Sequence, residues 1–288
     1  MPARMILTGD VNLMNVTDPG IPFAQVAEEF HGADVVFSNL ECCLAIPSGH
    51  SVSNEGFFAD PRAGKALRTA GIHAVGIANN VHYGEANILS SIARLDDYGV
   101  LHTGAGKDLA AARAPVIVER SGMRFGFLQR SSVYWPTDHE ARQDAPGIAV
   151  IRGHTAYHVP VFKTRVGVPP PNRPGVAPEI ITWADADYLG WFRDDIADLR
   201  PHVDVLVASC HWGLGRDVLA YMTDIAHAAI DAGADLVIGH GPHYCLPIDL
   251  LPHRPWRPAA CRVGRHDGAG ASGPRRRRGR ALPVRPAQ

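Results

Sequence analysis

The sequence predicts an α/β protein with mainly parallel strands. Short apolar runs alternate with helix-like segments, and five of the runs each end at side chains that can bind a metal ion. The five pairs are residues 4–8 with Asp10, 34–38 with Glu41, 74–78 with Asn79 and Asn80, 204–209 with His211, and 235–239 with His240 and His243. The carboxyl ends of parallel strands meet at one edge of a sheet, where open α/β sheets bind ligands. We therefore expect these side chains to gather at one polar site.

The segments between the runs have helical spacing. Helices are predicted over residues 24–30, 62–71, 86–98 and 217–232, and Gly71, Gly99 and Gly233 are placed as their C-terminal stops. Strand and helix in alternation favour parallel pairing through right-handed crossovers. Residues 116–119 and 124–128, separated by Ser121 and Gly122, predict a β-hairpin instead.

We expect one domain over residues 1–252 and a different kind of segment over residues 253–288. Within the domain, residues 133–182 form an irregular, proline-rich excursion, because prolines at 169–171, 174 and 178 exclude a continuous helix or a central strand. Two interpretations of this excursion stay open. It is either a lid over the strand ends or a packed surface loop.

The segment from residue 253 onward is rich in arginine, proline and glycine. It holds ten arginines and one aspartate, about +9, which leaves −10 on residues 1–252 of a chain with net charge −1. Three interpretations apply: a basic arm for an acidic polymer, a disordered tail, or a stretch translated out of its natural frame. The acidic body argues against non-specific nucleic-acid binding.

Composition indicates a globular protein of the cytoplasm. The chain has no apolar run of about 18 residues, so no membrane span is predicted, and its start has no secretory signal pattern. Five cysteines without a Cys-x-x-Cys motif argue against a disulfide framework or a structural zinc site. We expect the cysteines to fill space near the core.

The polar strand ends offer a mixed oxygen and nitrogen donor set. The two imidazoles of His240-Gly-Pro-His243 lie three residues apart on a turn and can face one ion. With Asp10, Glu41, Asn80 and His211 they suit manganese, iron or zinc. Two such divalent ions could clamp a phosphate ester and activate a water molecule, and a single ion would still polarise the ester.

The order of these motifs resembles the CapA family of poly-gamma-glutamate capsule biosynthesis proteins, within the calcineurin-like metallophosphoesterase superfamily. The resemblance spans residues 4–250. The motifs that carry it are Thr8-Gly9-Asp10, Asn39-Leu40-Glu41, Ala78-Asn79-Asn80, Gly104-Ala105-Gly106, Ser209-Cys210-His211-Trp212-Gly213 and Asp235-Leu-Val-Ile-Gly-His240-Gly-Pro-His243. It implies a four-layer α/β/β/α sandwich with a dinuclear metal site. The implied ligands are Asp10, Glu41, Asn80, His211, His240 and His243, and the implied activity is that of a metal-dependent phosphoesterase-like hydrolase.

Three departures from the family pattern bear on catalysis and on the fold. Asn12 stands where related phosphatases have a histidine, and Val81 stands where many family members have the histidine that protonates the leaving group. His82 is the candidate replacement beside Asn80, although adjacent residues point in different directions. Past His243 the family continues into a further strand, so we expect the sheet to be incomplete at its C-terminal end. Expected partners are a small phosphoester or a polyglutamate-type polyanion. The alternatives are a non-catalytic polyanion-binding factor for envelope polymer assembly and a truncated inactive product.

Overall fold

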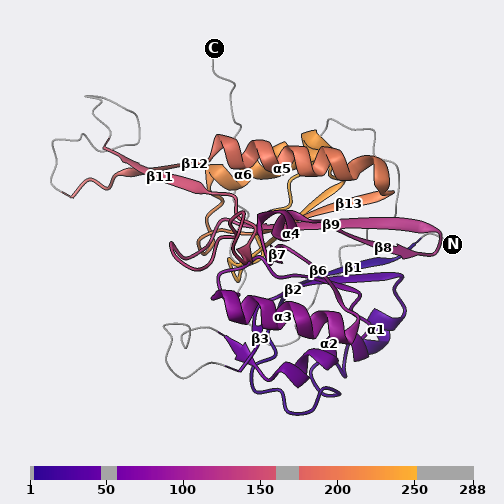
Figure 1. Ribbon diagram of the computed structural model, residues 1–288. Coiled ribbons are helices and arrows are strands. Elements are labelled where there is room, and N and C mark those ends of the chain that lie inside the picture. The colour runs from indigo at the N-terminus through magenta and orange to yellow at the C-terminus, as the bar shows by residue number, and fades with distance from the viewer. Residues whose placement is uncertain (1–2, 47–56, 160–174, 252–288) are drawn as a thin grey trace, which may run out of the picture.

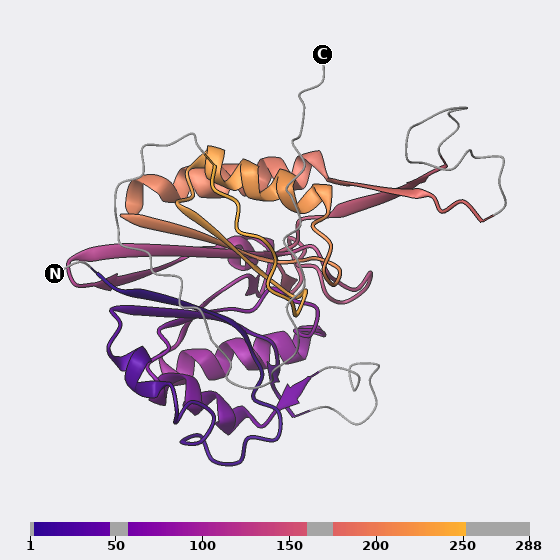
Figure 2. The same ribbon diagram turned by 180° about the vertical axis from the view of Figure 1, so that it is seen from behind.

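Two four-stranded sheets form the centre of the computed structural model, which describes residues 3–46, 57–159 and 175–251 (Figure 1). Helices lie on the outer side of each sheet, as the two opposite views show (Figures 1 and 2). Cys261, the arginine-rich tail from residue 253 and residues 160–174 of the proline-rich excursion lie outside the described residues. Within the described part, no helix is long and apolar enough to cross a membrane.

The first sheet is parallel throughout. Its strand order is β1 (Met5–Val11), β2 (Val35–Leu40), β5 (Ala74–Gly76) and β6 (Leu101–Thr103). The register of β1 against β2 shifts between Leu7 and Asp10, which places Asp10 opposite Asn39. The outer side is covered by α1 (Ala27–His31), the 3₁₀ turn η2 (Pro61–Gly64), α2 (Lys65–Thr69) and α3 (Glu85–Tyr98).

The second sheet has one antiparallel edge. Its order is β14 (Leu236–His240), β13 (Val205–His211), β9 (Met123–Ser131) and β8 (Val116–Arg120), and only β8 runs against its neighbour. In this register His211 lies opposite His240. Helices α5 (Ala186–Leu199) and α6 (Ala220–Ala232) cover its outer side, and the 3₁₀ turn η3 (Arg200–His202) follows α5.

Apolar side chains fill three spaces: one between each sheet and its helices, and one between the two sheets. In the space between the sheets, the rings of Phe37 and Phe127 stack with centroids 4.6 Å apart and planes 2° from parallel. Both side chains are fully buried. Burial of each contributes about 1.5–3 kcal/mol to stability. This packing holds the carboxyl ends of the two sheets in fixed relation.

Shorter elements lie along the chain between the strands of the two sheets. They are β3 (Cys43–Leu44) paired with β4 (Phe58–Ala59), β7 (Ala105–Gly106) paired with β10 (Gly147–Ile148), the helix α4 (Leu109–Arg113), and the hairpin of β11 (Gly153–His158) and β12 (Glu179–Ala184). The β11–β12 hairpin projects away from the sheets in both views (Figures 1 and 2). Earlier parts of the irregular excursion are packed inside, including His139, Ile148 and Ile151.

Most predicted elements are confirmed, with three corrections. The predicted helices over 86–98 and 217–232 correspond to α3 and α6, and the predicted hairpin is β8–β9. The five apolar runs are divided between two sheets rather than forming one. The predicted helices over 24–30 and 62–71 are reduced to α1 and to η2 followed by α2.

Helix α5 was not predicted. Asp185 caps this helix by accepting hydrogen bonds from the backbone N–H groups of Asp187 and Tyr188. The inner face of the helix carries the buried side chains of Phe192 and Ile196. The cysteine expectation holds for Cys42, Cys43 and Cys210, which are buried free thiols, whereas Cys245 is exposed.

Candidate metal centre

All six predicted ligands lie at the carboxyl ends of the strands. Asp10 is on β1 and Glu41 directly follows β2, while Asn80 lies in the turn after β5. His211 and His240 are the last residues of β13 and β14. His243 lies three residues further along the same turn. The two sheets thus place their polar ends at the same side of the molecule.

Short contacts join the six side chains into one cluster. Asp10 Oδ1 lies 3.4 Å from His240 Nδ1, and Asp10 Oδ2 lies 3.5 Å from His243 Nδ1. His211 Nε2 lies 2.8 Å from Asn80 Oδ1 and 4.0 Å from Glu41 Oε1. One donor atom from each of Asp10, Glu41 and His243 lies within 4.8 Å of the others. These separations are short enough for one cation to contact several donors.

The cluster is buried at its base and open at its rim. The side chains of His240 and His211 are 1% and 2% exposed and that of Glu41 is 8% exposed, while that of Asp10 is 18% and that of His243 is 68% exposed. A ligand from solvent therefore meets His243 first.

Three imidazole nitrogens in this cluster have no hydrogen-bond partner among the described residues. They are Nδ1 of His211 and both ring nitrogens of His240, and all three are buried. Leaving a buried polar atom unpaired costs about 1–3 kcal/mol. Neutral imidazole nitrogen beside carboxylates is the donor set of a divalent transition-metal site. The residues present therefore fit a metal ion.

The two carboxyl groups differ in pKa. Burial opposes ionisation of Asp10, but the contact with His240 and the hydrogen bond from Asn39 Nδ2 outweigh it and hold the pKa of Asp10 below its usual range. Burial, followed by the negative charge of Asp10, raises the pKa of Glu41 to about 7. Without a cation, the Asp10 carboxyl is therefore ionised at neutral pH, whereas the Glu41 carboxyl loses its proton only above about pH 7.

The buried imidazole of His211 is neutral at physiological pH. Burial lowers its pKa to about 4, against the opposing attraction of Asp10. Metal ligands must be deprotonated at the coordinating nitrogen. His211 is therefore already in the protonation state that a cation requires.

A network of buried amides supports Asp10 from beneath. Asn39 donates to Asp10 Oδ1 at 2.8 Å and accepts from Asn79 Nδ2 at 3.1 Å and from Gln129 Nε2 at 2.9 Å. Gln129, on β9, also donates to Ser209 Oγ on β13 and accepts from the backbone of Ala78. The network thus joins both sheets under the metal residues.

His139 and Trp135 fix the turn that carries Asn80. The Trp135 backbone donates to His139 Nδ1 at 2.8 Å, so His139 carries its proton on Nε2 and donates it to the Asn79 carbonyl at 3.1 Å. The Trp135 indole donates to the Asn80 carbonyl at 3.0 Å. Burial lowers the pKa of His139 to about 4, which keeps this pattern intact at neutral pH. Sequence reasoning missed both residues, since the irregular segment around them has no periodicity.

His82 lies inside the core rather than at the cluster surface. Its side chain is fully buried, its Nδ1 lies 3.2 Å from Asn79 Oδ1, and its Nε2 has no partner among the described residues. Burial lowers its pKa to about 3. Val81 is buried as well, and Asn12 is exposed and accepts a hydrogen bond from the Met14 backbone.

The turn that carries His243 needs glycine at position 241. Gly241 has φ +101°, and a Cβ there would lie 2.8 Å from the Trp212 carbonyl and 3.0 Å from His211 Nε2. His243 itself has φ +58°, a left-handed conformation that costs a non-glycine residue about 1–3 kcal/mol. In this conformation His243 Nδ1 lies 3.5 Å from Asp10 Oδ2.

Comparison with known proteins gives one family and several relatives. The model of the family described as bacterial capsule synthesis protein PGA_cap matches residues 4–256. A probable polyglutamine synthesis accessory protein of Mycobacterium tuberculosis is 28% identical over 238 residues, which covers 77% of this chain and 53% of the relative. An uncharacterized protein of Sinorhizobium fredii is 25% identical over 296 residues, covering 87% and 63%. The PGA biosynthesis protein CapA of Bacillus subtilis is 36% identical over 81 residues, covering 27% and 19%. The chain spans about half the length of the mycobacterial relative.

Proposed function

Because the chain belongs to the bacterial capsule synthesis protein family PGA_cap, we propose that it is a CapA-like protein of capsule or poly-gamma-glutamate biosynthesis with a metal-dependent phosphoesterase-like site. The family is part of the metallophosphoesterase superfamily. We further propose that the two sheets and their outer helices correspond to the four-layer α/β/β/α sandwich. The cytoplasmic location expected from the sequence stays a prediction.

One observation carries this proposal. Six side chains from five separate parts of the chain converge on one cluster, and three of its buried imidazole nitrogens have no hydrogen-bond partner among the described residues. A structural hydrogen-bond network would satisfy these nitrogens. Only one nitrogen of each imidazole can face an ion. The nitrogens that face the carboxylates are His240 Nδ1, 3.4 Å from Asp10 Oδ1, and His211 Nε2, 4.0 Å from Glu41 Oε1. A cation in the cluster would be bound through these two nitrogens.

The chain's own residues would share the chemistry as follows. Asp10, Glu41, Asn80, His211, His240 and His243 would hold one or two divalent ions. Such ions supply positive charge to a phosphate ester and lower the pKa of a bound water molecule. Asn39 keeps Asp10 oriented, while His139 and Trp135 hold the Asn79–Asn80 turn. The exposed His243 lies where a substrate enters.

Metal content and turnover of p-nitrophenyl phosphate with manganese test the proposal. We expect bound manganese and turnover in the wild-type chain, and loss of both in Asp10→Asn and in His240→Ala. Asp97→Asn, an exposed carboxylate on α3, is the matched control and should behave as wild type. Absence of bound metal under saturating manganese would remove this function.

A second candidate is favoured by the residues around Asn80. Val81 replaces the family's proton-donating histidine, and His82 is enclosed in the core. Both features favour a factor that binds a polyanion through its metal ions without hydrolysing it. Manganese-dependent binding of polyglutamate, with no turnover of p-nitrophenyl phosphate, would select this function over the first.

A further inference from the structure

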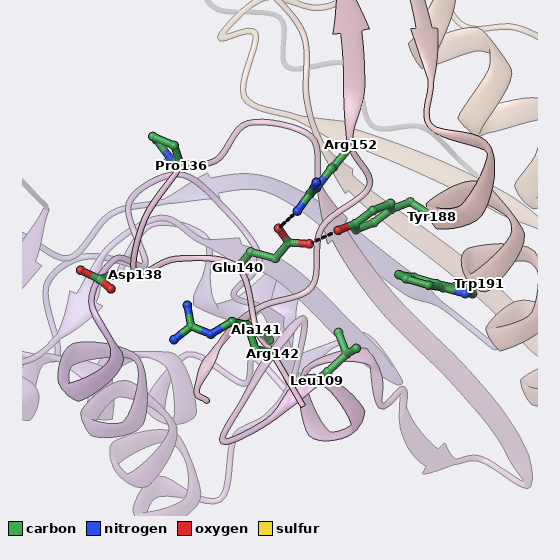
Figure 3. Close-up of a pocket in the computed structure, with 9 residues that line it drawn as sticks. All are labelled: Leu109, Pro136, Asp138, Glu140, Ala141, Arg142, Arg152, Tyr188 and Trp191. Carbon is green, nitrogen blue, oxygen red and sulfur yellow. Dashed lines mark hydrogen bonds and ion pairs between the residues drawn. The ribbon is translucent and has the colours of Figure 1, made fainter. Parts of the chain in front are cut away.

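A cavity lies between α4, α5 and the segment that leads from Trp135 to Arg142. It has a volume of about 310 Å³ and is lined by nine residues: Leu109, Pro136, Asp138, Glu140, Ala141, Arg142, Arg152, Tyr188 and Trp191 (Figure 3). None of the six metal residues lines it. His139 points from the same segment to the Asn79 carbonyl, whereas its neighbours Asp138 and Glu140 face the cavity.

The middle of the cavity wall is fixed and close to neutral. Arg152 donates to Glu140 at 2.7 Å, and the Tyr188 hydroxyl donates to the other oxygen of the same carboxylate. The Arg152 guanidinium also lies over the Tyr188 ring, 4.9 Å from its centroid, and that ring packs against Trp191 at 4.9 Å. The polar groups of Glu140, Arg152 and Tyr188 are thus paired with one another. This part of the wall limits the shape of a ligand but offers it no unpaired charge.

Two charged groups at one end of the cavity are not matched in this way. Arg142 makes only a 3.4 Å contact with Glu85, in which both side chains are about half exposed, and such surface pairs contribute little. The Asp138 carboxylate has no hydrogen bond or ion pair among the described residues. Figure 3 shows Asp138 and Arg142 at the same end, and the apolar Leu109 and Trp191 toward the other.

We propose that this cavity binds a free α-amino acid with an apolar side chain. Arg142 would take the α-carboxylate, Asp138 would take the α-ammonium, and the side chain would lie on Leu109 and Trp191. Paired groups of opposite charge select a zwitterion over a simple anion or a simple amine. The cavity volume lies at the lower end of the range for ligand pockets, about 300–1,000 Å³, which suits a molecule of this size.

Calorimetric titration of the metal-free full chain with leucine and its two half-analogues tests this inference. The half-analogues are 4-methylpentanoic acid, which lacks the ammonium, and 3-methylbutylamine, which lacks the carboxylate. We expect leucine to bind with a dissociation constant on the order of 1 mM, given its few atoms, and each half-analogue to bind at least about tenfold more weakly.

Substitutions of the two exposed charged residues test which of them binds the carboxylate of leucine and which binds its ammonium group. Arg142→Ala should weaken leucine and 4-methylpentanoic acid and leave 3-methylbutylamine unchanged. Asp138→Asn should weaken leucine and 3-methylbutylamine and leave 4-methylpentanoic acid unchanged. Arg94→Ala and Asp97→Asn remove the same charges from the exposed face of α3 and should change none of the three affinities.

Three results would overturn the inference. They are no saturable leucine binding, equal binding of leucine and 4-methylpentanoic acid, and leucine binding that survives Arg142→Ala. Because the titration needs neither metal nor turnover, it stands or fails separately from the proposed function.

Discussion

Glu41→Gln tests the electrostatics of the candidate metal centre. In the metal-free chain, burial and the charge of Asp10 raise the pKa of Glu41 from an ordinary value of 4.5 to about 7. Between these two pH values the unfolded chain has released the proton while the folded chain retains it. Stability therefore falls as pH rises through this window, and it levels off above pH 7.

The substitution removes this penalty while it keeps the shape of the side chain. Since one pH unit corresponds to about 1.4 kcal/mol, Glu41→Gln should be more stable than wild type by about 1 kcal/mol at pH 5 and by up to about 3 kcal/mol at pH 8. Urea unfolding followed by circular dichroism, in chelator, measures the difference. Glu119→Gln, an exposed carboxyl on β8, is the control and should change stability by less than about 0.5 kcal/mol.

Manganese should reverse the order of the two proteins. A ligand present at about 1,000 times its dissociation constant adds about 4.1 kcal/mol of stability, which exceeds the advantage of up to about 3 kcal/mol, and the neutral amide that replaces the Glu41 carboxylate lacks the charge to bind the ion as well. The reasoning is refuted by a gain that does not depend on pH, or by equal stabilisation of both proteins by manganese.

Three further substitutions test particular contacts. His139→Leu leaves the Asn79 carbonyl without its buried donor, so urea unfolding should show a loss of about 1–3 kcal/mol, and manganese titration should show weaker binding; unchanged manganese affinity would contradict the positioning role. Gly241→Ala forces a Cβ to within 3.0 Å of His211 Nε2, so metal binding should weaken even if circular dichroism shows a folded chain. Asp195→Ala removes the carboxylate partner of the Arg130 guanidinium, which is 3% exposed, so unfolding should show a loss of about 3–5 kcal/mol, and a loss under about 1 kcal/mol would count against this ion pair.

The sequence contained enough information for the strand ends but not for the way the strands pair. Each apolar run is a local pattern, and its polar end is read directly from the chain, so Asp10, Glu41 and His211 could be identified. Strand order is set by contacts between distant residues. Nothing near Phe37 or Phe127 in the chain indicates that they stack between two separate sheets.

The supporting residues of the site were harder to predict for a related reason. Gln129 follows the apolar residues 125–128 inside β9, and a polar residue that continues a buried strand needs buried hydrogen-bond partners. His139 and Trp135 lie in an irregular segment, where only the folded chain brings them to Asn79 and Asn80. Helix α5 was missed beside the proline-rich stretch, although Asp185 stands at its N-cap.

Metal analysis of the purified chain tests the central claim most directly. After the chain is loaded with manganese and the excess is removed, elemental mass spectrometry should find at least one manganese ion per chain in the wild type and far less in His240→Ala. Trace metal in both proteins, or the same content in both, would contradict the convergence of these side chains on a common cation.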